Sequence, residues 1–404
     1  MAARDASSPG AGRDLVQVVG RLWPAAEAVD VVRARSARRT GSTDDLLFVP
    51  TARRPWLLVP DQSRAAAAGV LRVSQTSTAA DRLVRAVLAG AFRAGIAQLC
   101  LVDRVRITGA RAGESIVSHL SAVLGRAVVV SLGVGTLRAN QKPILQVFDQ
   151  NGSVLAFVKV GDDEVSTALV DREARSLARL AGLRLRHLTL PRVLHHGSWR
   201  GLRLLVIGAL PTPVTAWAPR RAVPVAALAE LARAEGVEQV PVGAGPVVAA
   251  LRSCAGAVED RAVGRSVGAL ADALVARHGA VAVEHGIWHG DWTPWNMAFA
   301  GRQVSLWDWE RCADGVPVGA DALHYVMQRR ARETSDWDDA LAATTRIAPA
   351  LLGALGVRAP AAPVVDAYLA LLCARYLLAA EGPNGAALAL RARWALEVTE
   401  RRLS

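Results

Sequence analysis

Lysine is almost missing from this chain of 404 residues, although the chain is basic. Of its 48 lysine and arginine residues, only Lys142 and Lys159 are lysines. Such a bias indicates a coding preference of the genome rather than selection at each position. A lysine ammonium is a compact charge that fits where the planar arginine fork does not. The two lysines are therefore candidates for chemistry that an arginine cannot perform.

A concentrated basic surface is also missing. The formal net charge is +12 and the isoelectric point is about 10.8. The arginines are spread singly along the chain, and no stretch interleaves them with aromatic residues, so we expect no specific nucleic-acid partner. A nucleic-acid-binding protein stays open as an alternative, which a steep salt dependence of tight DNA binding would support.

Paired cysteines and targeting segments are missing as well. Cys100, Cys254, Cys312 and Cys373 form no CxxC pair, which is typical of reduced thiols in a cytoplasm. The start "MAARDASSPGAGRD" lacks the apolar core of a signal peptide. The longest uncharged run, Leu204–Pro219, is shorter than the ~20 apolar residues of a membrane span. The sequence predicts a cytoplasmic protein that does not associate with a membrane.

The length predicts two or three domains. Residues 1–112 contain two strand-like runs at 45–50 and 56–60, a helical stretch at 78–95 and a strand at 97–107. We expect this part to be an extra α/β domain that carries no catalytic constellation. It is interpreted as an accessory domain of unknown role.

The rest of the chain has an α+β pattern. Residues 113–210 read as a helix closed by Gly125, a strand, a hairpin at Asn151-Gly152, a helix at 166–181 and two more strands. After residue 211 helices are expected at 224–235, 246–276, 336–355, 362–380 and 385–402. A polar motif and a hairpin interrupt them at 283–310.

That motif, "WHGDWTPWN", is followed by "LWDWE". A hairpin centred on residue 302 would place Asn296 opposite Asp308, where an amide oxygen and a carboxylate can hold Mg²⁺. Asp291 could accept the proton of an attacking hydroxyl, whereas His289 is interpreted as structural. The alternative is a hairpin with exposed polar ends, which does not explain the tryptophans that flank Asp308.

A second constellation precedes the motif. Glu173 lies on an otherwise apolar helical stripe, so it needs a cation, and Lys159 lies on the strand just before that helix. A Lys159–Glu173 pair would hold the ammonium ready for phosphate oxygens. Gly133 and Gly135 form a turn whose backbone N–H groups could approach phosphate. No GxxxxGK[ST] motif and no third glycine are present, which excludes P-loop and dinucleotide-binding sites.

In this order the pieces resemble the phosphoryl-transfer layout of protein-kinase-like enzymes, and "HGDWTPWN" followed by "LWDWE" resembles the aminoglycoside phosphotransferase and choline kinase family. The resemblance covers residues 113–404. It implies a bilobal fold, with an ATP-binding N-lobe of small antiparallel sheet at 113–210. The C-lobe at 211–404 is mostly helical and would carry the catalytic loop and the acceptor site.

The resemblance also implies roles for single residues. Asp291 would be the catalytic base, and Asn296 and Asp308 would bind Mg²⁺. The strand "VIGAL" resembles the hinge that meets adenine, which points to Ile207 and Ala209. Asp321 would steady the active-site loop, and Lys159, Glu173 and the glycines would hold the ATP phosphates.

The expected function is therefore an ATP- and Mg²⁺-dependent transfer of phosphate to a hydroxyl of a small molecule. A sugar-like acceptor is slightly preferred over an aminoglycoside, because few acidic residues are placed to clamp a polycation. The open alternatives are a catalytically silent nucleotide-binding regulator on the same fold and a protein kinase. The region after Asp308 lacks an APE-like segment, which disfavours the protein kinase.

Overall fold

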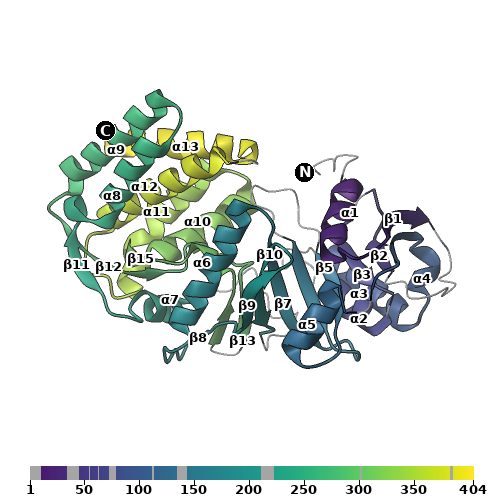
Figure 1. Cartoon of the computed structure of the whole chain (residues 1–404). Coiled ribbons are helices and arrows are strands. Elements are labelled where there is room, and N and C mark those ends of the chain that lie inside the picture. The colour runs from purple at the N-terminus through teal and green to yellow at the C-terminus, as the bar shows by residue number, and fades with distance from the viewer. Residues whose placement is uncertain are drawn as a thin grey trace. The chain divides into compact units, whose positions relative to one another are not determined.

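The computed structural model describes residues 11–33, 45–53, 55–61, 63–71, 79–111, 113–133, 143–210, 223–300, 303–382 and 385–404. The chain divides into two compact units (Figure 1). The first unit comprises Met1–Leu137, Gln141–Val170 and Arg192–Ala209. The second comprises Arg138–Asn140, Asp171–Pro191 and Leu210–Ser404.

The first unit is built on a sheet of nine antiparallel strands in the order β1-β4-β2-β3-β5-β6-β7-β10-β9. The strands are β1 (Ala28–Arg33), β2 (Leu46–Val49), β3 (Leu57–Pro60), β4 (Asp103–Thr108), β5 (Val129–Gly133), β6 (Ile144–Phe148), β7 (Val154–Gly161), β9 (Val193–Trp199) and β10 (Leu202–Gly208). The predicted turn at Asn151-Gly152 joins β6 to β7, and Gly152 has the positive φ, +83°, that such turns require.

Helices pack on both faces of this sheet. They are α1 (Ala11–Leu22), α2 (Ser63–Leu71), α3 (Ala79–Arg93), the short α4 (Ala97–Cys100) and α5 (Ile116–Leu124). One face packs with α1 and α5 around buried residues such as Phe48 and Val158. The other face packs with α2 and α3 around Val59 and Phe92. Gly125 ends α5 in the left-handed conformation (φ 65°), as the sequence predicts.

The N-terminal residues share this sheet with the residues that follow them. Strand β3 pairs with β5 through Leu57 opposite Gly133 and Leu58 opposite Leu132. The sequence predicts a boundary after residue 112, whereas the compact unit runs across that position. The reason is the continuous ladder, which lets both parts bury their apolar side chains in one core.

The second unit is mostly helical. Its helices are α7 (Val225–Ala232), α8 (Pro246–Ala257), α9 (Arg261–His278), α10 (Ala320–Thr334), α11 (Trp337–Ala354), α12 (Ala361–Ala380) and α13 (Ala386–Leu403). Helix α6 (Glu164–Leu180) begins in the first unit and ends in the second. The α+β fold, with a sheet-based unit and a mostly helical unit, agrees with the fold class that the sequence predicts.

Two small sheets complete the second unit. One has the order β11 (Glu238–Pro241), β12 (Ala282–Trp288), β15 (Ala313–Pro317). The other has the order β13 (Met297–Ala300), β14 (Gln303–Leu306), β8 (Leu188–Thr189). Short 3₁₀ turns lie at η1 (Val242–Ala244) and η2 (Trp309–Arg311). The polar motif of the sequence connects β12 to β13.

Several expected elements differ from the observed ones. The predicted helix 246–276 is two helices, because Asp260 caps the second by accepting from the N–H groups of Ala262 and Val263. Residues 97–100 form the short helix α4 instead of the start of a strand. Helices α1 and α10 and strand β1 were not predicted.

Helix α12 is long and apolar enough to cross a membrane by length and composition, the one such helix in the described part of the chain. Its most apolar stretch is 72% buried inside the protein. It packs against α8 and α13 and is therefore the central helix of the second unit.

Candidate active site

The motif backbone is anchored by one carboxylate on the first turn of α10. Asp321 accepts hydrogen bonds from the N–H groups of His289 (2.6 Å) and Gly290 (3.0 Å). Burial raises the pKa of Asp321 to about 7, and these two hydrogen bonds oppose that rise. The prediction that Asp321 steadies this loop fits these contacts. Arg375 on α12 holds the next peptide along the chain by donating to the carbonyl oxygen of Gly290.

Gly290 is the residue that the loop requires at its tightest point. Its φ is +81°, in the left-handed region, and a Cβ there would overlap with the carbonyl oxygen of Arg311. Only glycine meets both conditions without strain. The backbone conformation therefore explains why the central residue of the HGD sequence is glycine.

His289 is structural in its contacts. Its side chain is fully buried, its Nδ1 accepts from the N–H of Asp291 (3.2 Å), and its Nε2 lies 3.1 Å from the carbonyl oxygen of Trp307. Burial lowers the pKa of His289 to about 4, so the ring is neutral and Nε2 donates. The ring also meets Trp309 edge-on at 4.7 Å between centroids. Both nitrogens are used within the protein.

Asp291 is held at both carboxylate oxygens and still reaches solvent. Oδ2 accepts from the Asn296 amide nitrogen (2.9 Å), and Oδ1 lies 3.3 Å from Nε2 of His324. Burial raises the pKa of Asp291, but the hydrogen bond from His324 and the positive charge of Arg375 oppose this rise, and the pKa of Asp291 lies below its usual value. The side chain keeps 31% of its surface exposed. The carboxylate is therefore ionised, oriented and accessible.

Asn296 is oriented by the same residue. Its amide nitrogen donates to the main-chain oxygen of Asp291 (3.0 Å) and to its carboxylate. Both hydrogens of the amide group are thereby directed at Asp291. The amide oxygen, which is the atom that a hard cation prefers, is left for another partner.

The hairpin after the motif is one residue out of the predicted register. Met297 pairs with Leu306, and the N–H of Trp307 donates to the carbonyl oxygen of Asn296 (3.0 Å). Asn296 thus lies opposite Trp307 and not Asp308, because β13 and β14 pair about the point between residues 301 and 302. The predicted opposition of Asn296 and Asp308 is wrong in its register.

Asp308 follows β14 and has an unusual backbone conformation. It has φ 74° and ψ 55° and precedes the turn η2. A non-glycine residue in the left-handed region is uncommon and is concentrated at functional sites, and aspartate tolerates it better than most. This conformation breaks the strand alternation, so the side chain is no longer set by the β14 pleat.

Three carboxylates gather around Asp308, one of the two metal ligands that the sequence predicts. Oxygens of Glu173, Asp308 and Glu310 lie within 4.8 Å of one another. Glu173 is fully buried and accepts from the N–H of Trp309 (3.3 Å). Hard oxygen donors at this spacing suit Mg²⁺. The structure therefore brings Glu173 and Glu310 to Asp308 within the second unit.

The predicted nucleotide-binding residues of the first unit lie on its sheet. Lys159 is buried (7% exposed) on β7 opposite Ile144 and Leu205, and Gly133 ends β5. Gly135 lies outside the described residues. Their convergence with Asp291, Asn296 and Asp308 on one triphosphate stays a prediction.

Ile207 lies near the end of β10, and Ala209 is the first residue after that strand. The Ala209 N–H donates to the carbonyl oxygen of Leu155 (3.0 Å), so only its carbonyl oxygen is left for a base. Ile207 is buried and pairs with Phe157 and Val193. A role in adenine binding stays a prediction for both residues.

Sequence reasoning missed His324, which contacts the Asp291 carboxylate, and Tyr368, which contacts His324. His324 and Tyr368 are fully or almost fully buried and lie on α10 and α12. A histidine one helical turn after Asp321, on the same face, was the available signal for His324. No local pattern connects Tyr368 to the motif.

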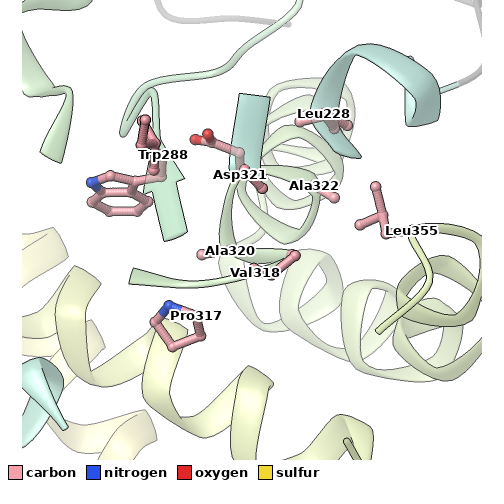
Figure 2. Close-up of a pocket in the computed structure, with 11 residues that line it drawn as sticks. Leu228, Trp288, Pro317, Val318, Ala320, Asp321, Ala322 and Leu355 are labelled. Carbon is pink, nitrogen blue, oxygen red and sulfur yellow. The ribbon is translucent and has the colours of Figure 1, made fainter. Parts of the chain in front are cut away.

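A small pocket of about 10 Å³, which has room for about one water molecule, lies beside Asp321. Apolar side chains such as Leu228, Val318 and Leu355 line it, and Figure 2 shows the Asp321 carboxylate at the side of Trp288. The Trp288 indole nitrogen is buried and has no hydrogen-bond partner among the described residues. The pocket is a packing gap behind the anchored loop, and it offers few polar groups to a ligand.

No family model and no curated protein sequence matches the chain. The solved structures it resembles include a thermostable mutant of aminoglycoside phosphotransferase APH(4)-Ia in complex with ADP and hygromycin B. That pair is 15% identical over 71% of this chain and 97% of the other, with a TM-score of 0.46. A choline/ethanolamine kinase family protein from Mesorhizobium loti is 16% identical over 67% and 90%, with a TM-score of 0.41. A macrolide 2'-phosphotransferase from Brachybacterium faecium is 18% identical over 71% and 97%, with a TM-score of 0.38.

These neighbours are phosphotransferases of the group that the motifs resemble. The likeness is distant, with every one of these TM-scores below 0.5. What those proteins bind is therefore no guide to this one, and its function has to be argued from its own residues.

Proposed function

We propose that the protein is an ATP- and Mg²⁺-dependent phosphotransferase that moves the γ-phosphate of ATP to a hydroxyl of a small molecule. The observation that supports this most is the Asp291 carboxylate, which is ionised, oriented by two donors and 31% exposed. A carboxylate in this state can receive a proton from an approaching hydroxyl. A structural carboxylate has no need to stay open to solvent.

The proposed reaction assigns one step to Asp291. The acceptor hydroxyl forms a bond to the γ-phosphorus while the bond from that phosphorus to the bridging oxygen of ADP breaks. The hydroxyl proton passes to Asp291, and ADP leaves with the electron pair of the broken bond. Because such transition states need little covalent chemistry from the protein, positioning and charge balance carry the catalysis.

A magnesium ion, when bound, would balance the charge of the phosphate oxygens. Asp308 with Glu173 and Glu310 would hold it, since their oxygens lie within 4.8 Å of one another. Asn296 would add its amide oxygen, because the amide nitrogen is engaged by Asp291. In the first unit, Lys159 would contact the phosphates, with Gly133 and Gly135 covering them.

The acceptor is proposed to be neutral and sugar-like. Trp295 lies in the loop between Asp291 and Asn296, and the Arg332 guanidinium lies 5.2 Å from the centre of its ring. A fixed positive charge beside the loop opposes a polycationic aminoglycoside. An aromatic ring at the same place suits stacking on a sugar.

The location is proposed to be the cytoplasm. All four cysteines are free thiols, two of them buried, as expected of a reducing compartment.

The test is ATP consumption by the full-length protein with a panel of monosaccharides, disaccharides, choline and aminoglycosides, with Mg²⁺ or with EDTA. We expect one acceptor class to stimulate turnover and EDTA to abolish it. Nucleotide binding without turnover on any acceptor would favour the silent regulator. Labelling of proteins in a mixture, with none of the small molecules, would favour a protein kinase.

A further inference from the structure

His324 touches the one side chain to which the proposed reaction gives a proton. It lies on α10, one turn after Asp321, and its side chain is 0% exposed. Its Nε2 is 3.3 Å from Oδ1 of Asp291, and its Nδ1 is 3.0 Å from the hydroxyl oxygen of Tyr368 on α12. The contact reaches the Asp291 oxygen that Asn296 does not use.

In the two hydrogen bonds that join Tyr368, His324 and Asp291, the donors and acceptors are fixed by chemistry. An ionised carboxylate has no hydrogen to give, so Nε2 of His324 must carry the hydrogen between them. A neutral imidazole has a single N–H, and burial lowers the pKa of His324 to about 4. Nδ1 is therefore bare and accepts from the Tyr368 hydroxyl. The sulfur of Met327, 3.5 Å from the same hydroxyl, is the weaker acceptor.

We propose that His324, fixed in its Nε2–H tautomer by Tyr368, is a positioning residue that sets the rotation of the Asp291 carboxylate. The inference rests on the proposed function and concerns the same site. Asn296 holds Oδ2 from one side and His324 holds Oδ1 from the other, so the carboxylate plane cannot turn. The lone pairs that remain point to the exposed part of the side chain.

His324 does not itself receive the reaction proton. Its Nδ1 is occupied by the Tyr368 hydroxyl, and that hydroxyl keeps its hydrogen because burial raises the pKa of Tyr368 well above its usual value. The hydrogen bonds from Tyr368 through His324 therefore orient Asp291, but they do not carry a proton away from it. This separates a positioning role from a proton relay.

Variants of His324 test the role through activity. His324→Gln keeps an N–H donor at nearly the place of Nε2, whereas His324→Leu removes it. We expect His324→Leu to lower kcat for ATP turnover roughly 10- to 100-fold, with KM for ATP changed less than about twofold, because a misplaced group costs rate and not binding. His324→Gln should restore most of the loss.

A matched control exists in the same unit. His278 is also buried, and its Nε2 also meets a carboxylate, that of Asp366, at 2.8 Å. His278→Gln should leave kcat within about twofold of wild type, since it changes a similar pair away from the loop. Tyr368→Phe removes the hydroxyl with the ring retained and should give a smaller kcat loss than His324→Leu.

The tautomer is measured without activity by long-range ¹H–¹⁵N correlation of the imidazoles in the full chain at pH 7, with His324→Gln assigning the signal. We expect the Nε2–H pattern, and its Nδ1 shift should move in Tyr368→Phe. An Nδ1–H pattern, or His324→Leu with wild-type kcat, overturns the inference and leaves the proposed function intact. A wild-type chain that turns over no ATP with any acceptor overturns the proposed function, and the catalytic meaning of the contact with it.

Discussion

Two buried histidine–aspartate pairs of the second unit are chemically alike and built for different ends. In the first, His278 meets Asp366 at 2.8 Å; in the second, His324 meets Asp291 at 3.3 Å. Asp366 also accepts from Arg402, and its side chain is 3% exposed. Asp291 has no ion pair with an arginine among the described residues and is 31% exposed.

The difference explains why the His278–Asp366 pair (the sealed pair) only stabilises the fold, whereas the His324–Asp291 pair (the open pair) can still react. A carboxylate sealed between a histidine and an arginine has its charge matched and its oxygens filled. A carboxylate held by an amide, a neutral imidazole and solvent keeps its charge but has room for one more partner. The exposure and the identity of the second donor, more than the presence of a histidine, distinguish the proposed catalytic pair.

The largest effect is expected from a substitution that removes Asp291 from the open pair. Asp291→Ala removes the proposed proton acceptor, so ATP turnover should fall by roughly 10²- to 10⁴-fold. ATP binding should stay nearly intact, because the phosphates are proposed to be held by other residues. Steady-state turnover and nucleotide titration measure the two quantities. Loss of nucleotide binding with turnover retained would contradict the role given to Asp291.

A substitution in the sealed pair should lower stability and leave activity unchanged. Asp366→Ala leaves His278 and Arg402 without their carboxylate, and we expect the free energy of unfolding to fall by roughly 3 kcal/mol. Arg402 is 27% exposed and can regain water, which keeps the loss at the low end of the range for buried pairs. Urea unfolding measures the loss. Activity per folded molecule should be unchanged, and a large fall in kcat would show that this pair also serves the site.

The sequence reveals the Asp291–His324 pair only in part. Asp291, Asn296 and Asp308 are predicted from spacing within one motif, and the Asp291–Asn296 contact is local. His324 lies 33 positions from Asp291, and Tyr368 lies 44 positions from His324. Such contacts depend on how helices pack, which the spacing along the chain does not encode.

The misses in the fold have a similar cause. Every residue of helix α10 from Ala320 to Gln328 is buried, so the helix lacks the one-sided apolar three-to-four pattern by which the other helices were predicted. The strands at 45–60 and the strand β5 were predicted, but the pairing of β3 with β5 was not, since a strand pattern does not indicate its neighbour. Local structure was predictable, and long-range pairing was not.

Lowering the pH should reduce the free energy of unfolding through protonation of His324 in the open pair. Its pKa is about 4 when folded against 6.5 for an ordinary histidine, so the unfolded chain binds the extra proton first. Stability is therefore lost as the pH falls from about 6.5 to 4, by roughly 2–3 kcal/mol for this group. His324→Gln cannot take up that proton, so its unfolding free energy should fall less over the same range. Identical slopes of unfolding free energy against pH for the two proteins would contradict a neutral buried His324.

The smallest effect concerns the backbone that carries the open pair. Gly290→Ala places a Cβ against the carbonyl oxygen of Arg311 at a φ of +81°, and we expect a loss of roughly 1–3 kcal/mol in unfolding free energy. Because Asp291 is the next residue, kcat should fall as well. Gly353→Ala is the control, since Gly353 lies in α11 with open space around its Cβ position and should gain about 0.5–1 kcal/mol.

Thermal unfolding and ATP turnover of the two alanine variants, measured side by side, separate loop geometry from helix propensity. If Gly290→Ala kept both wild-type stability and wild-type kcat, the loop would tolerate a side chain at its tightest point. The Asp321 anchor and the Arg375 contact would then not fix the peptide as tightly as their hydrogen bonds indicate. The orientation of Asp291 would in that case depend on His324 and Asn296 alone, and the loss in His324→Leu should approach that in Asp291→Ala.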